Sequence, residues 1–293
     1  MKRIHTGALI NYLFITIMGF ITLYPFIYIV SVSISPISAT MFNRVILLPK
    51  GFTTTAYEAV FKEKKLLMSF FNSVQYTFAG TVLSIFLTTL TAYPLAQPKF
   101  KKYAQIYMRF VVFTMLFSGG LIPTYLVIRS LKMINTFWVM IIPGAISSFY
   151  LILTKTFMQQ LPIELYEAAE IEGSGDFDKY LRIVLPLSKP IIACISLYYA
   201  VGIWNSYMTP LIYLISERKY PLQIYLRQLI LQSMAQEMEI RVSGSESMTW
   251  GASYSSESIK AAVLVISTIP ILIVYPFLQK YFITGIMVGA IKG

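Results

Sequence analysis

Carboxylate side chains are concentrated in one stretch of this 293-residue chain. Between positions 164 and 178 lie six of its 13 acidic residues, namely Glu164, Glu167, Glu170, Glu172, Asp176 and Asp178. Carboxylates could act as general acids and bases or hold a metal ion, yet the sequence shows no metal-ligand cluster and no recognisable pair of nucleophile and base. The single histidine, His5, and the single cysteine, Cys194, give no disulfide and no cysteine metal site. The acidic stretch could still be a surface for contact with another protein or a solvated connection.

The spacing within this stretch predicts a short helix with one continuous stripe, because residues three and four apart share a helix face. The stripe would consist of Glu164, Glu167, Ala168 and Ile171. Ala168 and Ala169 are small enough to let another surface come close. Gly173 is expected to end the helix, since glycine accepts the left-handed conformation that a helix terminus often needs, and Pro190 is placed to open the next helix. From composition alone, a solvated connection is as good an interpretation as a docking helix.

Everything around the acidic stretch has the composition of a membrane protein. Hydrophobic residues make up 56% of the chain, charged residues make up 13%, and the mean hydropathy is +0.66, far from soluble averages. Six long windows contain no Asp, Glu, Lys or Arg: residues 4–43, 66–98, 110–128, 133–154, 190–216 and 261–279. Each is close to or above the roughly 20 residues that cross a bilayer as a helix. The sequence therefore predicts an all-α membrane protein with six transmembrane helices.

Basic residues near the ends of these windows predict the orientation of the chain. Lys2 and Arg3 precede the first window, and the connection between the second and third windows holds Lys99, Lys101, Lys102 and Arg109. Both segments are expected in the cytoplasm, and with six spans the 159–189 loop and the carboxyl end join them there. The first outer loop, about residues 36–66, is an exception, because it is predicted to lie outside and yet is basic. The net charge of +11 forms no basic stripe with interleaved aromatics, so membrane lipid, and no nucleic acid, is the expected partner of these cations.

The fifth window carries polar side chains that could line a path for a solute. Tyr198 and Asn205 are seven residues apart and share a helix face, and a polar amide within a span faces protein or a cavity. Together with Trp204 and Tyr207, they are candidates for a substrate pathway. An alternative interpretation places Trp204 and Tyr207 in an interfacial aromatic belt and lets Asn205 bond a neighbouring helix.

The loop after this window, about residues 217–258, is the largest piece predicted to lie outside the membrane. Apolar residues at helical spacing in its first half predict a surface helix: Leu222, Tyr225, Leu226, Leu229 and Ile230. Its second half is rich in Ser and Gly and contains Trp250 and Tyr254, which would suit contact with an external protein or a sugar. A disordered linker is an equally good interpretation of that half.

Two motifs resemble a known family. Glu167-Ala168-Ala169, Gly173, Ile183 and Leu185-Pro186 stand at the spacing of the EAA loop in permease subunits of bacterial ABC importers. The carboxyl end, with Tyr275-Pro276-Phe277 and Gly285-Ile286-Met287, is similar to that of carbohydrate-importer permeases. It most resembles the smaller subunit of a maltose-type pair, in the branch that handles oligosaccharides and polysaccharides. The resemblance covers about residues 69–293.

The resemblance implies a type I ABC importer permease fold in which the acidic stretch is a cytoplasmic coupling helix. The residues that it assigns to contact with the ATPase are Glu167, Ala168, Ala169, Ile171, Gly173, Ile183, Leu185 and Pro186. The implied partners are a homologous permease subunit, two ATPase subunits and an extracytoplasmic solute-binding protein, which Trp250 and Tyr254 would contact. ATP and Mg²⁺ would belong to the partner ATPase, because this chain has no phosphate-binding loop; it is expected to bind no cofactor itself.

The predicted organisation has two parts. Residues 1–68 would form the first transmembrane helix and an outer loop. Residues 69–293 would form the permease core with five helices, the coupling loop 159–189, the outer loop 217–258 and a cytoplasmic tail 283–293. The predicted function is non-catalytic import of a carbohydrate across the bacterial cytoplasmic membrane, with an acidic glycan such as alginate as one candidate. A secondary carrier or channel for a polar solute is the alternative, and an intramembrane enzyme comes third.

Overall fold

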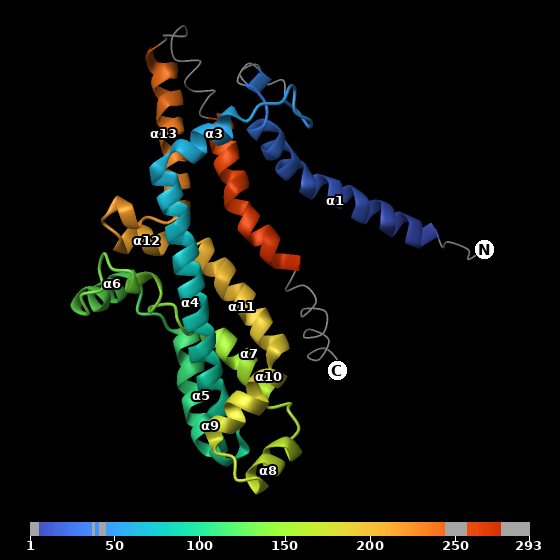
Figure 1. The fold of residues 1–293 in the computed structure, drawn as a ribbon, viewed down its shortest axis with the longest axis vertical. Coiled ribbons are helices and arrows are strands. Elements are labelled where there is room, and N and C mark those ends of the chain that lie inside the picture. Colours follow the sequence, from blue (N-terminus) through green and yellow to red (C-terminus); the bar gives the residue numbers. More distant parts are fainter. Residues whose placement is uncertain (1–5, 37–38, 41–44, 244–256, 277–293) are drawn as a thin grey trace. The chain divides into compact units, whose positions relative to one another are not determined.

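The described part of the chain is built from helices. The computed structural model describes residues 6–36, 39–40, 45–243 and 257–276, and it has no strand in these ranges, so the predicted all-α class is confirmed (Figure 1). The first half contains α1 (Thr6–Ser33), α3 (Thr55–Lys62), α4 (Lys64–Ala96), α5 (Lys101–Leu116), α6 (Leu121–Ser130) and the 3₁₀ turn η2 (Trp138–Met140). The second half contains α7 (Ser148–Met158), α8 (Glu164–Ile171), α9 (Asp176–Lys179), α10 (Leu185–Leu187), α11 (Lys189–Trp204), α12 (Met208–Tyr213) and α13 (Leu222–Ser243). A further helix covers Glu257–Pro276.

Three of these helices are long and apolar enough to cross a membrane unaided. They are Ile10–Ser33 within α1, Lys64–Ala96 and Glu257–Pro276. Two bent pairs meet the same test only when each pair is taken as one span: Pro98–Leu116 with Leu121–Ser130, bent by 117°, and Asp176–Leu187 with Lys189–Trp204, bent by 79°. The described residues thus supply three candidate spans, or up to five with the bent pairs. The count of six remains a prediction.

The bend between α5 and α6 falls inside the third uncharged window. Phe117 ends α5 in an extended conformation, and Gly120 has a φ of 80° before α6 begins at Leu121. This left-handed conformation suits glycine, which has no Cβ to clash with the following carbonyl. The Ser118 hydroxyl accepts a 3.2 Å hydrogen bond from the Gly120 N–H and stabilises the turn. Composition alone does not reveal such a bend, because the window remains apolar throughout.

The fourth window, residues 133–154, differs from the predicted continuous helix. Its first part consists of turns and η2, and α7 begins only at Ser148. Asn135 has a φ of 57°, and its side-chain oxygen accepts hydrogen bonds from the N–H groups of Ile215 and Ser216, at 3.2 and 3.1 Å. Its own N–H donates to the Tyr213 carbonyl at 2.8 Å. These bonds hold the segment beside the end of α12 and replace the bonds of a helix.

We expect Asn135→Ala to destabilise this loop substantially. Alanine removes two acceptor bonds, each contributing about 1 kcal/mol, and leaves a left-handed residue that costs about 1–2 kcal/mol without glycine or asparagine. Asn135→Gly accepts the backbone conformation but loses the same bonds, so it separates the two contributions. The measurement is the free energy of unfolding in detergent. Equal stability of the alanine variant and the wild type would contradict this account.

The chain divides into two compact units. One comprises Met1–Phe70 with Ile224–Pro270, and the other comprises Phe71–Gln223 with Ile271–Gly293. In the first unit, Val32, Ala39, Val45 and Ala261 form a small core, and the Ser33 and Tyr57 hydroxyls are 2.8 Å apart. The helix predicted around Leu222–Ile230 is present as the start of α13. The division between residues 68 and 69 remains a prediction.

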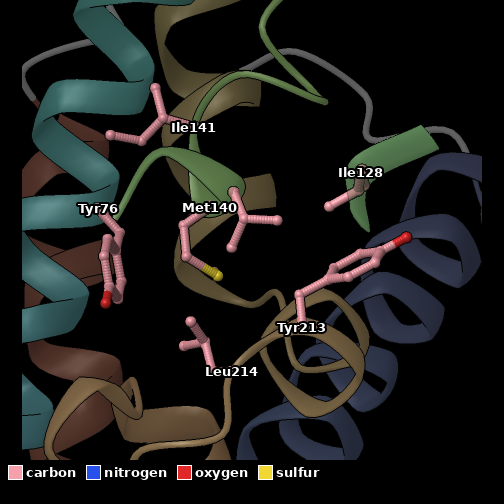
Figure 2. Close-up of a cluster of buried hydrophobic side chains, with 7 residues drawn as sticks. Tyr76, Ile128, Met140, Ile141, Tyr213 and Leu214 are labelled. Carbon is pink, nitrogen blue, oxygen red and sulfur yellow. The ribbon is translucent and has the colours of Figure 1, made fainter. Parts of the chain in front are cut away.

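The second unit contains the acidic stretch and, among its described residues, three buried apolar clusters. Figure 2 shows one of them, in which side chains of α4, α6, η2 and α12 meet: Tyr76, Ile128, Val139, Met140, Ile141, Tyr213 and Leu214. Hydrogen bonds reinforce it, since the Tyr76 hydroxyl donates to the Lys219 carbonyl at 2.9 Å and the Ser73 hydroxyl accepts from the Leu222 N–H at 2.8 Å. α4 is therefore the common support of this unit.

Candidate functional site

The acidic stretch forms the short helix that its sequence predicts. α8 covers Glu164–Ile171 and carries Glu164 and Glu167 in its first turn, where carboxylates are favourable near the positive end of the helix dipole. Gly173 has a φ of 78°. Its N–H donates to the Glu170 carbonyl at 3.0 Å, and the Ser174 N–H donates to the Ala169 carbonyl at 2.9 Å. This pair of bonds is the Schellman motif, so the predicted helix end at Gly173 is confirmed.

The exposed face of α8 combines acidic groups with one protruding apolar side chain. Glu164, Glu167 and Ala168 are exposed, and Ile171 is 88% exposed at the end of the helix. When another surface covers an isoleucine that is so exposed, the burial lowers the free energy and favours association. Ala169, by contrast, is buried. The structure therefore separates the two alanines, since Ala168 belongs to the exposed face and Ala169 to the packed face.

A buried apolar cluster fastens the loop to the long helices. Its members from α4 and α7 are Ala92, Tyr93, Ala96, Leu151 and Met158, and its members from the loop after α8 are Tyr180 and Val184. Tyr166 of α8 packs against this cluster. The pKa of Tyr166 is raised, because the effect of burial exceeds the lowering effect of a hydrogen bond with the Gln97 side chain. α8 is thus attached to the end of α4 by both apolar packing and a polar contact.

Tyr180 is the central side chain of this attachment. It is only 2% exposed, and its hydroxyl is 2.9 Å from the Thr89 hydroxyl of α4. Because Thr89 donates to the Ile85 carbonyl at 2.8 Å, Tyr180 is the donor toward Thr89. The ring centroids of Tyr93 and Tyr180 are 5.5 Å apart. The predictions from sequence missed Tyr180, although an aromatic residue beside the acidic stretch and two adjacent threonines in an apolar helix were signals for it.

Three ion pairs link the loop to itself and to the short connection between α4 and α5. Lys99 contacts Asp176 at 2.7 Å, Lys179 contacts Glu170 at 3.1 Å, and Arg182 contacts Asp178 at 3.4 Å. The Lys179 side chain is 6% exposed, so its partner Glu170 compensates a charge that would otherwise be buried alone. In Figure 1, α8 and α9 lie beside the junction of α4 and α5, where Lys99 is located.

The chain leaves the loop through a widened turn. Tyr180–Val184 is a π-helix in which the Leu185 N–H donates to the Tyr180 carbonyl. Ile183 lies in this turn and is half-buried, while Leu185 and Pro186 lie in α10, half-buried and exposed respectively. α11 follows with Pro190 in its first turn, as predicted. π-turns of this kind frequently occur at functional sites.

The aromatic residues of α11 form a second candidate site together with α7. The Tyr198 ring is 44% exposed and stacks on Tyr150 of α7, with ring centroids 5.6 Å apart and planes 11° apart. The neighbouring Tyr199 is buried. Its hydroxyl accepts from the Ser147 N–H at 2.9 Å and is 2.9 Å from the Thr88 hydroxyl. Tyr199 in turn packs edge-on against the half-buried Tyr150, with ring centroids 4.8 Å apart, and so supports the Tyr198–Tyr150 pair. Tyr150 and Tyr199 were not among the predicted site residues.

The other predicted pathway residues follow α11. Asn205 is exposed directly after the helix, and its side-chain oxygen lies 3.4 Å from the Gln223 nitrogen. Tyr207 is 49% exposed, whereas Trp204 is 5% exposed and packs inside the protein. The structure thus exposes Tyr198, Asn205 and Tyr207 but not Trp204. Trp250, Tyr254 and the tail 283–293 lie outside the described residues.

Comparison with known proteins covers nearly the whole chain. Residues 65–288 match the family described as "Binding-protein-dependent transport system inner membrane component". Protein LplC of Bacillus subtilis (strain 168) is 43% identical over 283 residues, which are 97% of this chain and 94% of LplC. The polygalacturonan/rhamnogalacturonan transport system permease protein YtcP of the same organism is 41% identical over 282 residues, 96% of each chain.

A solved structure extends these similarities to the fold. It is the crystal structure of a bacterial ABC transporter involved in the import of the acidic polysaccharide alginate. One of its chains matches with a TM-score of 0.85 and 32% identity, covering 96% of this chain and 98% of that one. The matched regions include α8, the π-turn and α11, so the similarity extends over both candidate sites.

Proposed function

Because the chain belongs to the family of binding-protein-dependent transport system inner membrane components, we propose that it conducts an oligosaccharide or polysaccharide as the permease subunit of an ABC importer. The observation that carries this proposal is the similarity over nearly the full length to YtcP and to the alginate-importer chain. The chain is a multi-pass protein of the inner membrane, and its family consists of transport subunits that are not enzymes.

In this proposal α8 is the coupling helix. Its exposed face, with Ile171 and the carboxylates Glu164 and Glu167, would seat in a cleft of an ATPase subunit that binds ATP and Mg²⁺. Closure of two ATPase subunits would move α8, and the buried Tyr180 would pass this displacement to α4. The Schellman end at Gly173 and the ion pairs would help the loop to move as one piece.

The same proposal places the other partners around the membrane. A homologous permease subunit would complete the pore, and a solute-binding protein would deliver sugar from outside, with Trp250 and Tyr254 as its predicted contacts. The basic connection 97–109 supports a cytoplasmic position for α8 and for both termini. Such an arrangement requires reciprocal coupling, since a loaded binding protein must bias the same two-state element that ATP biases.

We further propose an acidic glycan as the substrate. Two similar proteins are named for polygalacturonan/rhamnogalacturonan and for alginate, and the first outer loop of this chain is basic. The exposed Tyr198, stacked on Tyr150, offers an aromatic face to a sugar ring, and Asn205 offers an amide to its hydroxyl groups. These three residues would line the pathway on the side of this subunit.

The decisive experiment measures ATP hydrolysis by the reconstituted importer, with and without its binding protein loaded with oligogalacturonate. Wild-type hydrolysis is expected to rise several-fold, and Glu167→Ala and Gly173→Pro are expected to lose this stimulation while the complex still assembles. Proline cannot adopt the φ of 78° found at Gly173, because its ring fixes φ near −65°. Solute flux that needs no ATP would instead favour a carrier or channel.

A further inference from the structure

A basic cavity lies beside the attachment of α8, at the junction of α4 and α5. Its volume is about 840 Å³, and it is lined by the end of α4, the connection to α5, α5 itself, and the end of α7 with the residue that follows it. Its polar lining consists of three cations and three amides: Lys101, Arg109, Lys155, Gln97, Gln105 and Gln159. A volume of this size falls in the range of small-molecule sites, roughly 300–1,000 Å³.

Within the part of the chain that the structure describes, no counter-charge faces the three cations of this cavity. No carboxylate lines it, and the side chains of Lys101, Arg109 and Lys155 make no ion pair or hydrogen bond with the described residues, although the Lys155 carbonyl accepts from the Gln159 N–H at 3.0 Å. The neighbouring Lys99, in contrast, is paired with Asp176 at 2.7 Å. Three like charges around one cavity repel each other, and a bound anion relieves this repulsion. The cavity is therefore complementary to an anionic group.

The rest of the lining distinguishes a lipid from a free anion. Leu95, Met108 and Val112 give the cavity an apolar wall that continues up α5. A second cavity of about 320 Å³ shares Leu95 and Ala104 with the first, and it has no charged side chain. Inorganic phosphate needs neither an apolar wall nor a neighbouring apolar groove, whereas a phospholipid needs both. Basic pockets between transmembrane helices are known sites for anionic lipid headgroups.

We propose that this cavity binds the phosphate-bearing headgroup of an anionic phospholipid, with an acyl chain lying along the apolar face of α5. The cations would hold the phosphate, and the amides would bond the glycerol oxygens. Gln97 lies in the cavity wall and also hydrogen-bonds Tyr166 of α8, so a bound lipid would brace the attachment of that helix. The inference uses the membrane location of the family and does not depend on the transported substrate.

The test is native mass spectrometry of the purified full-length chain released from nanodiscs of phosphatidylglycerol or phosphatidylcholine. We expect wild-type protein to retain phosphatidylglycerol but not phosphatidylcholine. Lys101→Gln, Arg109→Gln and Lys155→Gln combined should retain at least tenfold less. The matched control combines Lys62→Gln, Arg129→Gln and Lys102→Gln, which removes the same charges at exposed positions outside the cavity. This control should retain phosphatidylglycerol as the wild type does.

Three results would overturn the proposal. The first is equal retention by the cavity variant and the wild type. The second is equal retention of the two lipids, which would remove the role of charge. The third is displacement of the lipid by millimolar phosphate or by oligogalacturonate, which would make the cavity an anion or solute site. If the triple variant does not fold, Met108→Trp narrows the cavity at its apolar wall, keeps all three cations and should lower retention of phosphatidylglycerol.

Discussion

Ile171→Asp is expected to abolish co-purification of the ATPase subunit with this chain, and transport with it. The isoleucine is 88% exposed at the end of α8, so its replacement costs the isolated chain little. Burial of such a side chain contributes about 1.5–3 kcal/mol, equivalent to about a ten- to hundredfold change in affinity, and the new carboxylate adds repulsion to an already acidic face. The measurement is the amount of ATPase retained on the tagged permease.

Ile215→Asp is the matched control for this variant. Ile215 is 71% exposed and belongs to the segment after α12, away from the coupling loop. Its replacement makes the same change in charge and volume and should leave ATPase retention unchanged. Normal retention by Ile171→Asp would show that the protruding side chain is not part of the contact. Loss in both variants would indicate a general effect of the new charge.

Tyr180→Ala should uncouple ATP hydrolysis from transport. Truncation of a buried aromatic side chain typically costs about 3–5 kcal/mol, and here it also removes the ring beneath Tyr93 and the bond to Thr89. The loop would then move without displacing α4. We expect the sugar imported per ATP hydrolysed to fall at least tenfold. Tyr180→Phe loses only the hydroxyl bond, about 1 kcal/mol, and should keep most of the coupling.

A second variant separates uncoupling from simple instability. Tyr213 is a buried tyrosine outside the coupling loop, at 7% exposure, and it packs in the cluster of Figure 2. Tyr213→Ala should lower stability comparably but preserve the ratio of transport to hydrolysis. Equal ratios in Tyr180→Ala and the wild type would refute the role of Tyr180 in transmission.

The sequence was most informative where local chemistry decides the structure. Helix α8, its end at Gly173 and the start of α11 near Pro190 all depend on residues within a few positions of each other, and all three were predicted correctly. The helical class followed from the apolar composition, because a bilayer allows few backbone structures in which every polar group is hydrogen-bonded. Tyr198 and Asn205 are both exposed, but Asn205 follows the end of α11, so the shared helix face expected from their spacing does not extend to it.

Features that depend on distant residues could not be predicted in this way. The fourth window does not begin as the expected helix, because Asn135 has a φ of 57° and its side chain bonds residues 80 and 81 positions later. Thr88 and Thr89 are ordinary in an apolar helix until Tyr199 and Tyr180 reach them from other parts of the chain. Lys155 similarly lines the basic cavity together with Lys101 and Arg109, although it belongs to α7 and they belong to α5.

The π-turn at Tyr180–Val184 is a place where the acidic motif can change its length by one residue. This turn holds one residue more than a regular helical turn, so deletion of a single residue there would restore an ordinary α-helix and leave the segments on both sides in nearly the same orientation. A deletion within α8 or α11 would instead rotate everything on one side by about 100° about the helix axis. A one-residue alignment gap at 180–184 in a homologous chain would therefore be compatible with an α8 that faces the same direction, whereas a gap within α8 would not.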